Sequence, residues 1–517
     1  MAPRLSNVGS KKLLELPPAL RRTLFSASTQ GTGGRSPELF DVVCVGGGPA
    51  GLSFVNALRS NPSTQSLKIA LVDSQDITTS RTLTTPDLYS NRCSSLTPSS
   101  VRFLHETGVA DLLDHGRTQP YQAMDVWDGV SGSKIHFDPI DTTDSSFSGV
   151  ANMIPGSRWQ QSRREYEGED QGVVARMCEN GNLTGALLER LNDLKGVELL
   201  DKTKVESIDL GPEAEKNSNT PDLSLWPVVS LPNNRKLVAR LLVGADGANS
   251  PVRTFADIPS HGWDYGRHGT VATLTLDREF TVGEIRTAYQ RFLPTGPIAL
   301  LPLPGNRASL VWSNTIPNAA KLKSLPPSDF TAMVNAAFRL LHFDIEYMLS
   351  SQMPSGGQAE EAAWREQNTD SNALGLPRSF PRVVEVQEGS VASFPLRMRH
   401  ADTYTGHRVA LLGDAAHTVH PLAGQGLNLG LADAESLASC LVKGAETGMD
   451  IGSSWCLDEY NSQRWAANNA MLGIVDKLHK LYSAGSGPVV WGRSLGLDLV
   501  DKLGPLKGVL MGAASGR

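Results

Sequence analysis

The feature that most constrains this chain is a glycine-rich turn that joins an apolar strand to a helix. The run DVVCVGGGPAG starts at Asp41, and Gly46, Gly48 and Gly51 fit the GxGxxG spacing. In such a turn the first glycine permits the tight bend, the second lets the backbone approach a pyrophosphate, and the third permits close helix–sheet contact. The N-terminus of the following helix also favours negative charge. The turn therefore predicts that a dinucleotide binds here.

The next apolar run places a carboxylate where such a ligand needs one. LKIALVDS starts at Leu67, and its shortness is typical of a buried strand in a parallel sheet. The strand ends at Asp73, which we expect to accept a hydrogen bond from a ribose hydroxyl. A plain tight turn could also produce the glycine cluster, but the strand context and Asp73 favour the dinucleotide.

Two further strand-end turns lie far along the chain. LLVGADGANS contains Asp246, and VALLGDAAH contains Gly413 and Asp414 and is followed by HPLAGQGLNLGLAD, which starts at His420. An enzyme that binds only a nicotinamide dinucleotide has no need of these turns, whereas a protein that surrounds the whole of FAD does. Read singly, Asp414 could be a helix N-cap and GADG an ordinary strand end. Together the three turns predict FAD.

A different pattern follows in the middle of the chain. Between 269 and 312, alternating apolar and polar residues occur in TVATLTLD, RTAYQRFL, PIALLPL and ASLVWS, which is typical of an antiparallel sheet. The polar stretch 351–376 is expected to be a loop. The predicted fold class is α/β, with a Rossmann-like FAD-binding domain, a second antiparallel-sheet lobe for substrate and a C-terminal helical region. The expected divisions are 40–260 and 401–435 for FAD, 261–400 for substrate and 436–517 for the helical region.

The first 34 residues differ in composition from the rest. They hold five basic residues against the single acid Glu15, and they include the hydroxyl-rich run RRTLFSASTQ. No apolar core of a secretory signal is present. This composition predicts a mitochondrial transit peptide over 1–34, with a tail of no significance as the alternative.

Composition also limits the other classes of function. The net charge of −6 gives no reason to expect nucleic-acid binding. The five cysteines are scattered without CxxC spacing, and His417 and His420 have no further ligand at suitable spacing, so no metal site is predicted. No run of 18 or more apolar residues occurs, so no membrane span is expected.

The set of motifs resembles that of the para-hydroxybenzoate-hydroxylase-like flavoprotein monooxygenases. The continuous HPLAGQGLNLGLAD resembles the ubiquinone-biosynthesis branch of that family, as do NRCSSLTPSSVRFL from Asn91, AYQRFLPTGPIALLPL from Ala288 and PLKGVLMGAA near the C-terminus. The resemblance covers nearly all of the chain after Phe40. The mitochondrial members of the branch match best and agree with the N-terminal prediction.

The resemblance implies roles for particular residues. Asp414 is expected to bind the ribityl chain of FAD, and Arg92 to lie near the ribityl or pyrophosphate. The full set of expected FAD contacts is Gly46, Gly48, Gly51, Asp73, Arg92, Asn180, Asp246, Gly413, Asp414, Gly426, Leu427 and Asn428. The residues expected to face the flavin ring are Pro421, Gly424, Gln425 and Gly426. The sheet that carries Tyr289, Phe292 and Pro297 is expected to form the substrate wall, and no catalytic base is assigned.

The resemblance also implies a reaction and a setting. The reaction is hydroxylation of the aromatic ring of a polyprenylated 4-hydroxybenzoate or phenol, ortho to the 4-hydroxyl, through a flavin C4a-hydroperoxide formed with O2. The implied electron donor is a ferredoxin with its reductase. The expected location is the matrix face of the mitochondrial inner membrane, peripherally attached and within a multi-enzyme coenzyme Q biosynthesis complex.

Two alternatives stay open. One is a hydroxylase of another phenol, such as a salicylate-type compound. The other is a non-catalytic flavoprotein-fold module that binds prenylated proteins, although such modules lack an intact GD pair followed by HPLAGQG. The amphipathic segment 488–511 fits either a packed terminal helix or a contact with a membrane surface.

Overall fold

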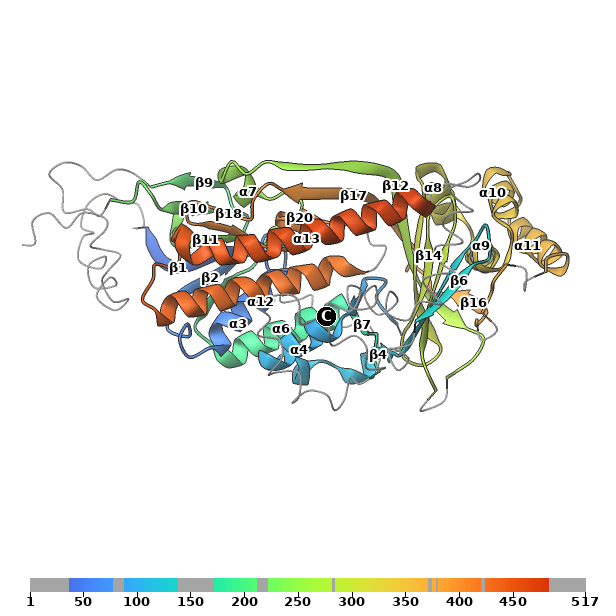
Figure 1. Ribbon diagram of the computed structural model, residues 1–517, viewed down its shortest axis with the longest axis horizontal. Coiled ribbons are helices and arrows are strands. Elements are labelled where there is room, and N and C mark those ends of the chain that lie inside the picture. The colour runs from blue at the N-terminus through green and yellow to red at the C-terminus, as the bar shows by residue number, and fades with distance from the viewer. Residues whose placement is uncertain are drawn as a thin grey trace, which may run out of the picture.

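The computed structural model shows an α/β lobe at one end and a β-rich lobe with a helical cover at the other (Figure 1). This arrangement confirms the predicted fold class. The transit peptide predicted at 1–34, Pro421 and the amphipathic segment 488–511 lie outside the described residues. The structure describes residues 37–77, 88–137, 172–211, 222–280, 284–370, 374–377, 380–419 and 424–482.

The α/β lobe is built on an eight-stranded sheet. Its strands are β1 (Glu38–Val45), β2 (Ile69–Val72), β8 (Val197–Leu200), β9 (Ser207–Leu210), β10 (Pro227–Leu231), β11 (Arg235–Gly244), β18 (Thr405–Gly406) and β19 (Val409–Leu411). The order is β18-β19-β11-β1-β2-β8, with β10 on β11 and β9 on β10. β1, β2, β11 and β19 are parallel, and Val45 pairs with both Val72 and Gly244. The three glycine turns follow β1, β11 and β19, so they meet at one edge of the sheet.

Helices cover this sheet and extend beyond it. They are α3 (Pro49–Ser60), α4 (Pro98–Glu106), α6 (Asn180–Leu194), α7 (Pro251–Phe255), α12 (Gln425–Glu446) and α13 (Ser454–Tyr482), with short 3-10 turns η2 (Ala110–Leu112), η3 (His115–Arg117) and η7 (Gly413–Ala415). α12 packs on α3 and runs beside α13 (Figure 1). The expected division between 435 and 436 falls inside α12, so it would split one helix.

The β-rich lobe is built on a nine-stranded sheet. Its strands are β5 (Ala123–Asp128), β6 (Lys134–Phe137), β12 (Ser260–Leu276), β13 (Thr287–Phe292), β14 (Ile298–Pro302), β15 (Arg307–Thr315), β16 (Val383–Val386), β17 (Ala392–Ala401) and β20 (His417–Thr418). All pairs are antiparallel except β13 with β5. β5 and β6 come from within 40–260, so part of the segment assigned to FAD contributes to the second sheet.

Two long elements join the lobes. β12 pairs with β17 from Ser260 to Val271, and this ribbon runs from the α/β lobe into the nine-stranded sheet (Figure 1). Its register shifts between Asp264 and His268. α13 runs the same way, and Tyr482 in its last turn stacks on Phe292 of β13, with ring centroids 3.8 Å apart.

Four helices cover one face of the nine-stranded sheet, namely α8 (Ile316–Ser324), α9 (Pro327–Arg339), α10 (His342–Ser350) and α11 (Gly357–Gln367). The predicted loop at 351–376 is wrong, because α11 lies within it. Only Gln358 and Ala362 of α11 are buried. A helix that is polar almost all round has the composition of a loop, which explains the error.

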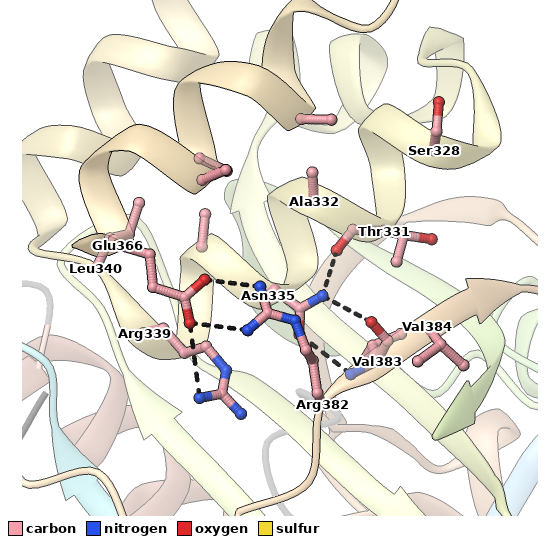
Figure 2. Close-up of a pocket in the computed structure, with 14 residues that line it drawn as sticks. Ser328, Thr331, Ala332, Asn335, Arg339, Leu340, Glu366, Arg382, Val383 and Val384 are labelled. Carbon is pink, nitrogen blue, oxygen red and sulfur yellow. Dashed lines mark hydrogen bonds and ion pairs between the residues drawn. The ribbon is translucent and has the colours of Figure 1, made fainter. Parts of the chain in front are cut away.

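A cavity of about 310 Å³ lies in this helical cover, between α9, α11 and β16 (Figure 2). At its edge the Glu366 carboxylate accepts two hydrogen bonds from Arg382, at 2.9 and 2.7 Å, and lies 3.8 Å from Arg339. These charges largely satisfy one another. The cavity lies on the helix-covered face, away from the glycine turns.

A small sheet lies between the lobes. It has the order β3 (Cys93–Leu96), β7 (Ala175–Glu179) and β4 (Thr118–Tyr121). Tyr121 and Met177 from this sheet pack with Ala288 of β13 and with Leu303. It therefore connects the face of the nine-stranded sheet that lacks the helical cover to the α/β lobe.

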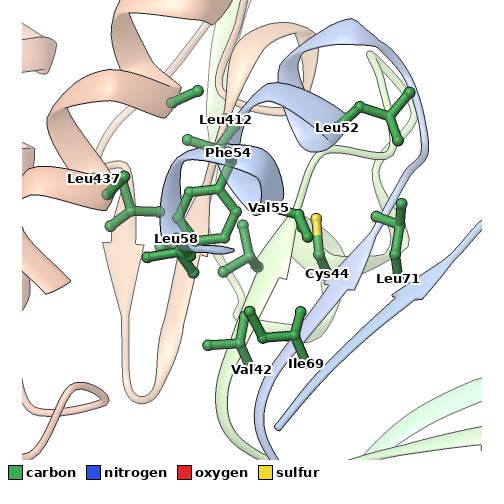
Figure 3. Packing of buried hydrophobic residues seen from close by; sticks show 14 of the residues in the cluster. Val42, Cys44, Leu52, Phe54, Val55, Leu58, Ile69, Leu71, Leu412 and Leu437 are labelled. Carbon is green, nitrogen blue, oxygen red and sulfur yellow. The ribbon is translucent and has the colours of Figure 1, made fainter. Parts of the chain in front are cut away.

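The main hydrophobic core lies between the eight-stranded sheet and its helices (Figure 3). Phe54 and Leu58 of α3 are fully buried among Val42 from β1, Ile69 from β2 and Leu437 from α12. Burying one such side chain stabilises a fold by about 1.5–3 kcal/mol. This packing holds α3, and with it the first glycine turn, in a fixed position. Among the described helices, none combines the length and the hydropathy needed to cross a bilayer.

Candidate functional site

Two glycines of the first turn are required by packing within the protein. Gly46 has φ +112°, and a Cβ there would lie 2.1 Å from the carbonyl oxygen of Ala245. A Cβ on Gly51 would lie 2.1 Å from the carbonyl oxygen of Gly46. The turn after β1 therefore touches the turn after β11 without any side chain between them.

Gly48 is different, because a Cβ there would meet nothing within 4 Å. Gly48 is the N-cap of α3, and no side chain caps this helix. The first N–H groups of α3 thus face open space, where a helix terminus favours an anion. The space and the donors fit a pyrophosphate.

Asp73 lies at the end of β2 and is half-buried. Its Oδ2 accepts a hydrogen bond from the N–H of Gly47 at 2.6 Å, and its Oδ1 accepts one from the N–H of Gln75 at 2.7 Å. The carboxylate therefore orders the first turn directly. Each oxygen keeps a second lone pair for a ligand hydroxyl, so the ribose contact stays a prediction.

The structure brings Arg92 and Asn180 together. The N–H of Asn180 donates to the carbonyl oxygen of Arg92 at 2.9 Å, and the Ser94 hydroxyl donates to Asn180 Oδ1 at 2.7 Å. The Arg92 side chain is exposed and forms no ion pair with another described residue. Its guanidinium is available to a ligand.

A buried ion pair fixes the loop before Arg92 and is absent from the predicted set. Arg117 donates from Nε to Glu179 Oε2 at 2.6 Å and from Nη2 to Oε1 at 3.0 Å, and Oε1 also accepts from the N–H of Ser90 at 2.6 Å. The hydrogen bond to Glu179 raises the pKa of Arg117 above its ordinary value. Glu179 precedes Asn180 directly, so the pair positions both predicted contacts.

Asp246 follows β11 and has an unsatisfied oxygen. Its Oδ2 accepts from the N–H of Val252 at 3.1 Å, but its buried Oδ1 has no hydrogen-bond partner within the described ranges. Burial raises the pKa of the Asp246 carboxyl. An orphaned acceptor beside Gly46 is consistent with a ligand that supplies a donor there.

Asp414 lies in η7, after β19. Its carboxylate is accessible to solvent and makes no hydrogen bond with another residue that the structure describes. Desolvation by the surrounding protein nonetheless raises the pKa of Asp414, against the lowering effect of His417. An exposed carboxylate without a partner, next to the other glycine turns, is the setting expected for a group that binds a ribityl hydroxyl.

The turn that carries Asp414 is held by Asp433, a residue outside the predicted set. Asp433 is completely buried, and its carboxylate accepts from the Gly413 N–H at 3.1 Å and from His417 Nε2 at 2.5 Å. It also accepts from Arg464 Nε at 2.8 Å and Asn468 Nδ2 at 3.1 Å. Burial alone would raise the pKa of Asp433, but the charges of His417 and Arg464 overcome this effect and hold the pKa well below its usual range. An acid in the apolar run LNLGLAD is the sequence signal for it.

The N-terminus of α12 supplies open backbone. Gly424, at φ +61°, is its N-cap, no side chain caps it, and a Cβ on Gly426 would meet nothing within 4 Å. Gln425 is buried, and Leu427 packs partly against the main core. The backbone N–H groups around Gly426 therefore offer the surface expected to face a flat ring.

The side chain of Asn428, another expected FAD contact, is hydrogen-bonded within the protein. Asn428 Oδ1 accepts from the Thr97 N–H at 3.0 Å and from the Ser100 hydroxyl at 2.8 Å, and Nδ2 donates to the Ser95 carbonyl oxygen at 2.7 Å. The hydrogen bonds of the Asn428 amide thus go to the turn between β3 and α4. Asn428 fixes the start of α12 and can face a cofactor only through its backbone.

The predicted substrate wall is divided between two faces of β13, because side chains alternate along a strand. Tyr289 packs under the helical cover with Phe380, with ring centroids 5.0 Å apart. Phe292 lies on the opposite face, where it packs with Val126, and the buried Pro297 directly precedes β14. Tyr289 therefore does not line a site between the lobes, whereas Phe292 lies on the face turned toward the α/β lobe.

No group of three or more His, Cys, Asp or Glu side chains arranged to hold a metal ion occurs in the described parts of the chain. His417 Nε2 is hydrogen-bonded to the Asp433 carboxylate.

Comparisons with known proteins agree with this site. A family model described as an FAD binding domain matches residues 40–335 and 349–473. The ubiquinone biosynthesis monooxygenase COQ6 of Saccharomyces cerevisiae is 38% identical over 93% of this chain and 95% of its own length. The COQ6 protein of Xenopus tropicalis is 36% identical over 96% of this chain and 97% of its own. Among solved structures, p-nitrophenol 4-monooxygenase from Pseudomonas putida shares the fold, with a TM-score of 0.59, 18% identity and coverage of 92% and 97% of the two chains.

Proposed function

The chain belongs to the family of FAD-dependent monooxygenases that contains the mitochondrial ubiquinone biosynthesis enzymes, and on that premise we propose its substrate and its partners. FAD is its cofactor, and it is a flavin-dependent aromatic monooxygenase. The proposed substrate is a polyprenylated 4-hydroxybenzoate or related phenol, hydroxylated ortho to the 4-hydroxyl. The relatives' printed role in ubiquinone biosynthesis supports this choice.

The residues at the sheet edge fit FAD. Gly48 with the start of α3 would hold the pyrophosphate, Asp73 the ribose and Asp414 the ribityl chain. The observation that carries the proposal is the open space at Gly48 after β1, together with carboxylate oxygens of Asp246 after β11 and Asp414 after β19 that have no partner among the described residues. When bound and reduced, FAD would activate O2, which would supply the oxygen atom transferred to the ring.

The chain's own contribution is to bind, orient and shield. The N-terminus of α12 presents uncapped N–H groups that stabilise negative charge near Gly426. The sheet face that carries Phe292 holds the aromatic ring in one orientation, and its apolar side chains exclude water. Because the phenol is activated by its own hydroxyl, we assign no protein nucleophile and no metal to the reaction.

We further propose that the enzyme works in the mitochondrion, attached peripherally to the matrix face of the inner membrane within a coenzyme Q biosynthesis complex. The composition of residues 1–34 and the mitochondrial names of the relatives support the compartment. A ferredoxin and its reductase are the proposed electron donors.

The test is product formation by the purified full-length enzyme. A prenylated 4-hydroxybenzoate and O2 are supplied with either NADPH alone or a reduced ferredoxin system, and we expect a catechol with the ferredoxin system. Fast reduction of bound FAD by NADPH alone would reject the proposed donor and leave the hydroxylase standing. No catechol under either donor would reject the substrate.

The alternatives give different results in the same assay. A hydroxylase of a salicylate-type phenol would show no preference for longer prenyl chains. A binding module without chemistry would purify without a yellow flavin.

A further inference from the structure

The face of the nine-stranded sheet turned toward the α/β lobe carries a buried glutamine whose amide is unused. Gln290 on β13 is 5% exposed, and its side chain makes no hydrogen bond with any residue in the described part of the chain. Buried polar groups nearly always find partners within the protein. The amide of Gln290 has none among the described residues, and its residual exposure leaves it within reach of solvent or a ligand.

The neighbours of Gln290 along β13 show that the missing hydrogen bond is specific to the face of the sheet on which Gln290 lies. Arg291 points to the helical cover, where it donates from Nη1 to the Ala337 carbonyl oxygen at 2.9 Å. Ala288 shares the face of Gln290 and packs with Tyr121. The buried guanidinium on the helical side thus has protein partners at Nη1 and Nη2, whereas the Gln290 amide has none among the described residues.

Contacts connect this face to the start of α12. The Tyr121 and Ser95 hydroxyls share a hydrogen bond at 2.8 Å. The Cβ of Ser95 lies 3.5 Å from the place where a Cβ on Gly424 would be. Gln290 is two residues beyond Ala288 on the same face, so it lies on the face of the sheet that these contacts link to the start of α12.

The row of side chains across the sheet at Gln290 is otherwise apolar. Register places Val126 on one side of it, and Ala299, Val311 and Val271 in sequence on the other. The last three are half-buried, unlike the fully buried residues of the helical side. The row is therefore an apolar strip with one hydrogen-bonding group near its end.

We propose that the Gln290 amide binds the phenolic hydroxyl of the substrate ring, and that Ala299, Val311 and Val271 contact the apolar part of the same molecule. The amide offers both a donor and an acceptor, so it can pair with a phenol in either direction. This inference rests on the proposed function and adds the residue that distinguishes a phenol from an unhydroxylated ring.

The experiment uses the FAD-bound full-length enzyme and measures the change in flavin absorbance on titration with two probes. The probes are 3-prenyl-4-hydroxybenzoate and 3-prenylbenzoate, which lacks the hydroxyl. We expect the wild-type enzyme to bind the hydroxylated probe about tenfold more tightly or better, because sites built to bind a hydroxyl reject analogues that lack it. In Gln290→Leu the ratio should fall to near one, with affinity for 3-prenylbenzoate retained.

Thermal stability separates this role from a structural one. Removing an amide that has no partner should not lower the Tm, so Gln290→Leu and the longer Gln290→Met should both be at least as stable as the wild type. Gln358→Leu is the matched control. Gln358 is 1% exposed and donates to the Met348 carbonyl oxygen at 2.9 Å, so this change should lower the Tm and leave the probe ratio unchanged.

Each outcome of these experiments either supports or overturns the role proposed for Gln290. A tenfold ratio that persists in Gln290→Leu would overturn the inference and leave the proposed function intact. So would a Tm loss as large as that of Gln358→Leu, or failure of both Gln290 variants to fold. Failure of the wild-type enzyme to bind either probe would overturn the proposed substrate, and this inference with it.

Discussion

In the third turn, the Asp414 carboxylate stays open to a ligand. The nearby Asp433 carboxylate, by contrast, already accepts hydrogen bonds from His417 and Arg464. We expect Asp414→Ala to weaken FAD binding by about 1–3 kcal/mol, the usual effect of losing one partner of a buried hydrogen bond. Fluorescence titration of the apoprotein with FAD measures this change. Asp111→Ala is the control, since the Asp111 side chain is 81% exposed and lies far along the chain. Unchanged FAD affinity in Asp414→Ala would remove Asp414 from the site.

His400 makes a second prediction at this scale, about pH. Burial and the nearby His417 lower the pKa of His400 from 6.5 to about 4. Between these values the unfolded chain binds a proton that the folded chain does not, so folding stability falls as the pH falls. His400→Gln should make urea unfolding less dependent on pH between 6.5 and 4. His261→Gln, at a side chain that is 77% exposed, should keep the wild-type dependence. Equal slopes for wild type and His400→Gln would contradict the prediction.

Among the elements, α12, α13 and η7 depend on one another through a single carboxylate. Asp433 on α12 bonds Arg464 and Asn468 of α13 and the N–H of Gly413 in η7. Asp433→Asn leaves buried positive charge without its partner, so we expect a loss of about 3–5 kcal/mol in the free energy of unfolding. FAD affinity should fall as well, because the turn with Asp414 loses its support. Urea denaturation and FAD titration measure the two effects.

The exposed Asp458 provides the control for this prediction. Asp458→Asn should change neither quantity. A loss below about 1 kcal/mol in Asp433→Asn would mean that the buried cations find other partners, and the Asp433 network would then not be the support of η7.

Elements also show how far sequence reasoning reaches. The glycine turns were predictable because their chemistry is local: a strand, a bend and a helix follow within a dozen residues. α11 was not, because its polar sequence GQAEEAAWREQ contains no apolar face to reveal a helix. The sequence also could not predict on which face of the sheet Tyr289 lies. At β13 Phe380 covers Tyr289 on one face and Tyr482 covers Phe292 on the other, so both rings are buried and the alternation carries no sign of which one meets the ligand.

At the scale of the molecule, the segment before the fold carries its own prediction. A fluorescent fusion of the full chain should enter mitochondria, and a fusion lacking residues 1–34 should not, because these residues hold the basic, hydroxyl-rich composition of a transit peptide. The deletion stops before residue 37, where the described structure begins, so it removes none of the described elements. Mitochondrial import of the shortened fusion would show that the targeting signal lies elsewhere in the chain.

Two long elements connect the lobes, the strand β12 and the helix α13, and they run in the same direction. β12 has 17 residues and reaches about 55 Å, and α13 has 29 residues and reaches about 44 Å. β12 is anchored by pairing with β17 from Ser260 to Val271 and with β16 from Leu274 to Leu276. α13 is anchored by the Tyr460 hydroxyl, which donates to the Leu411 carbonyl oxygen, and by Tyr482, which stacks on Phe292. With both connections in place, a hinge movement of one lobe against the other would have to deform β12 and α13 together. The pairing of β12 with β17 is interrupted at residues 265–267, where Gly266 has φ +63°. We therefore expect the sheet face that carries Phe292 to keep its position relative to the α/β lobe when substrate binds.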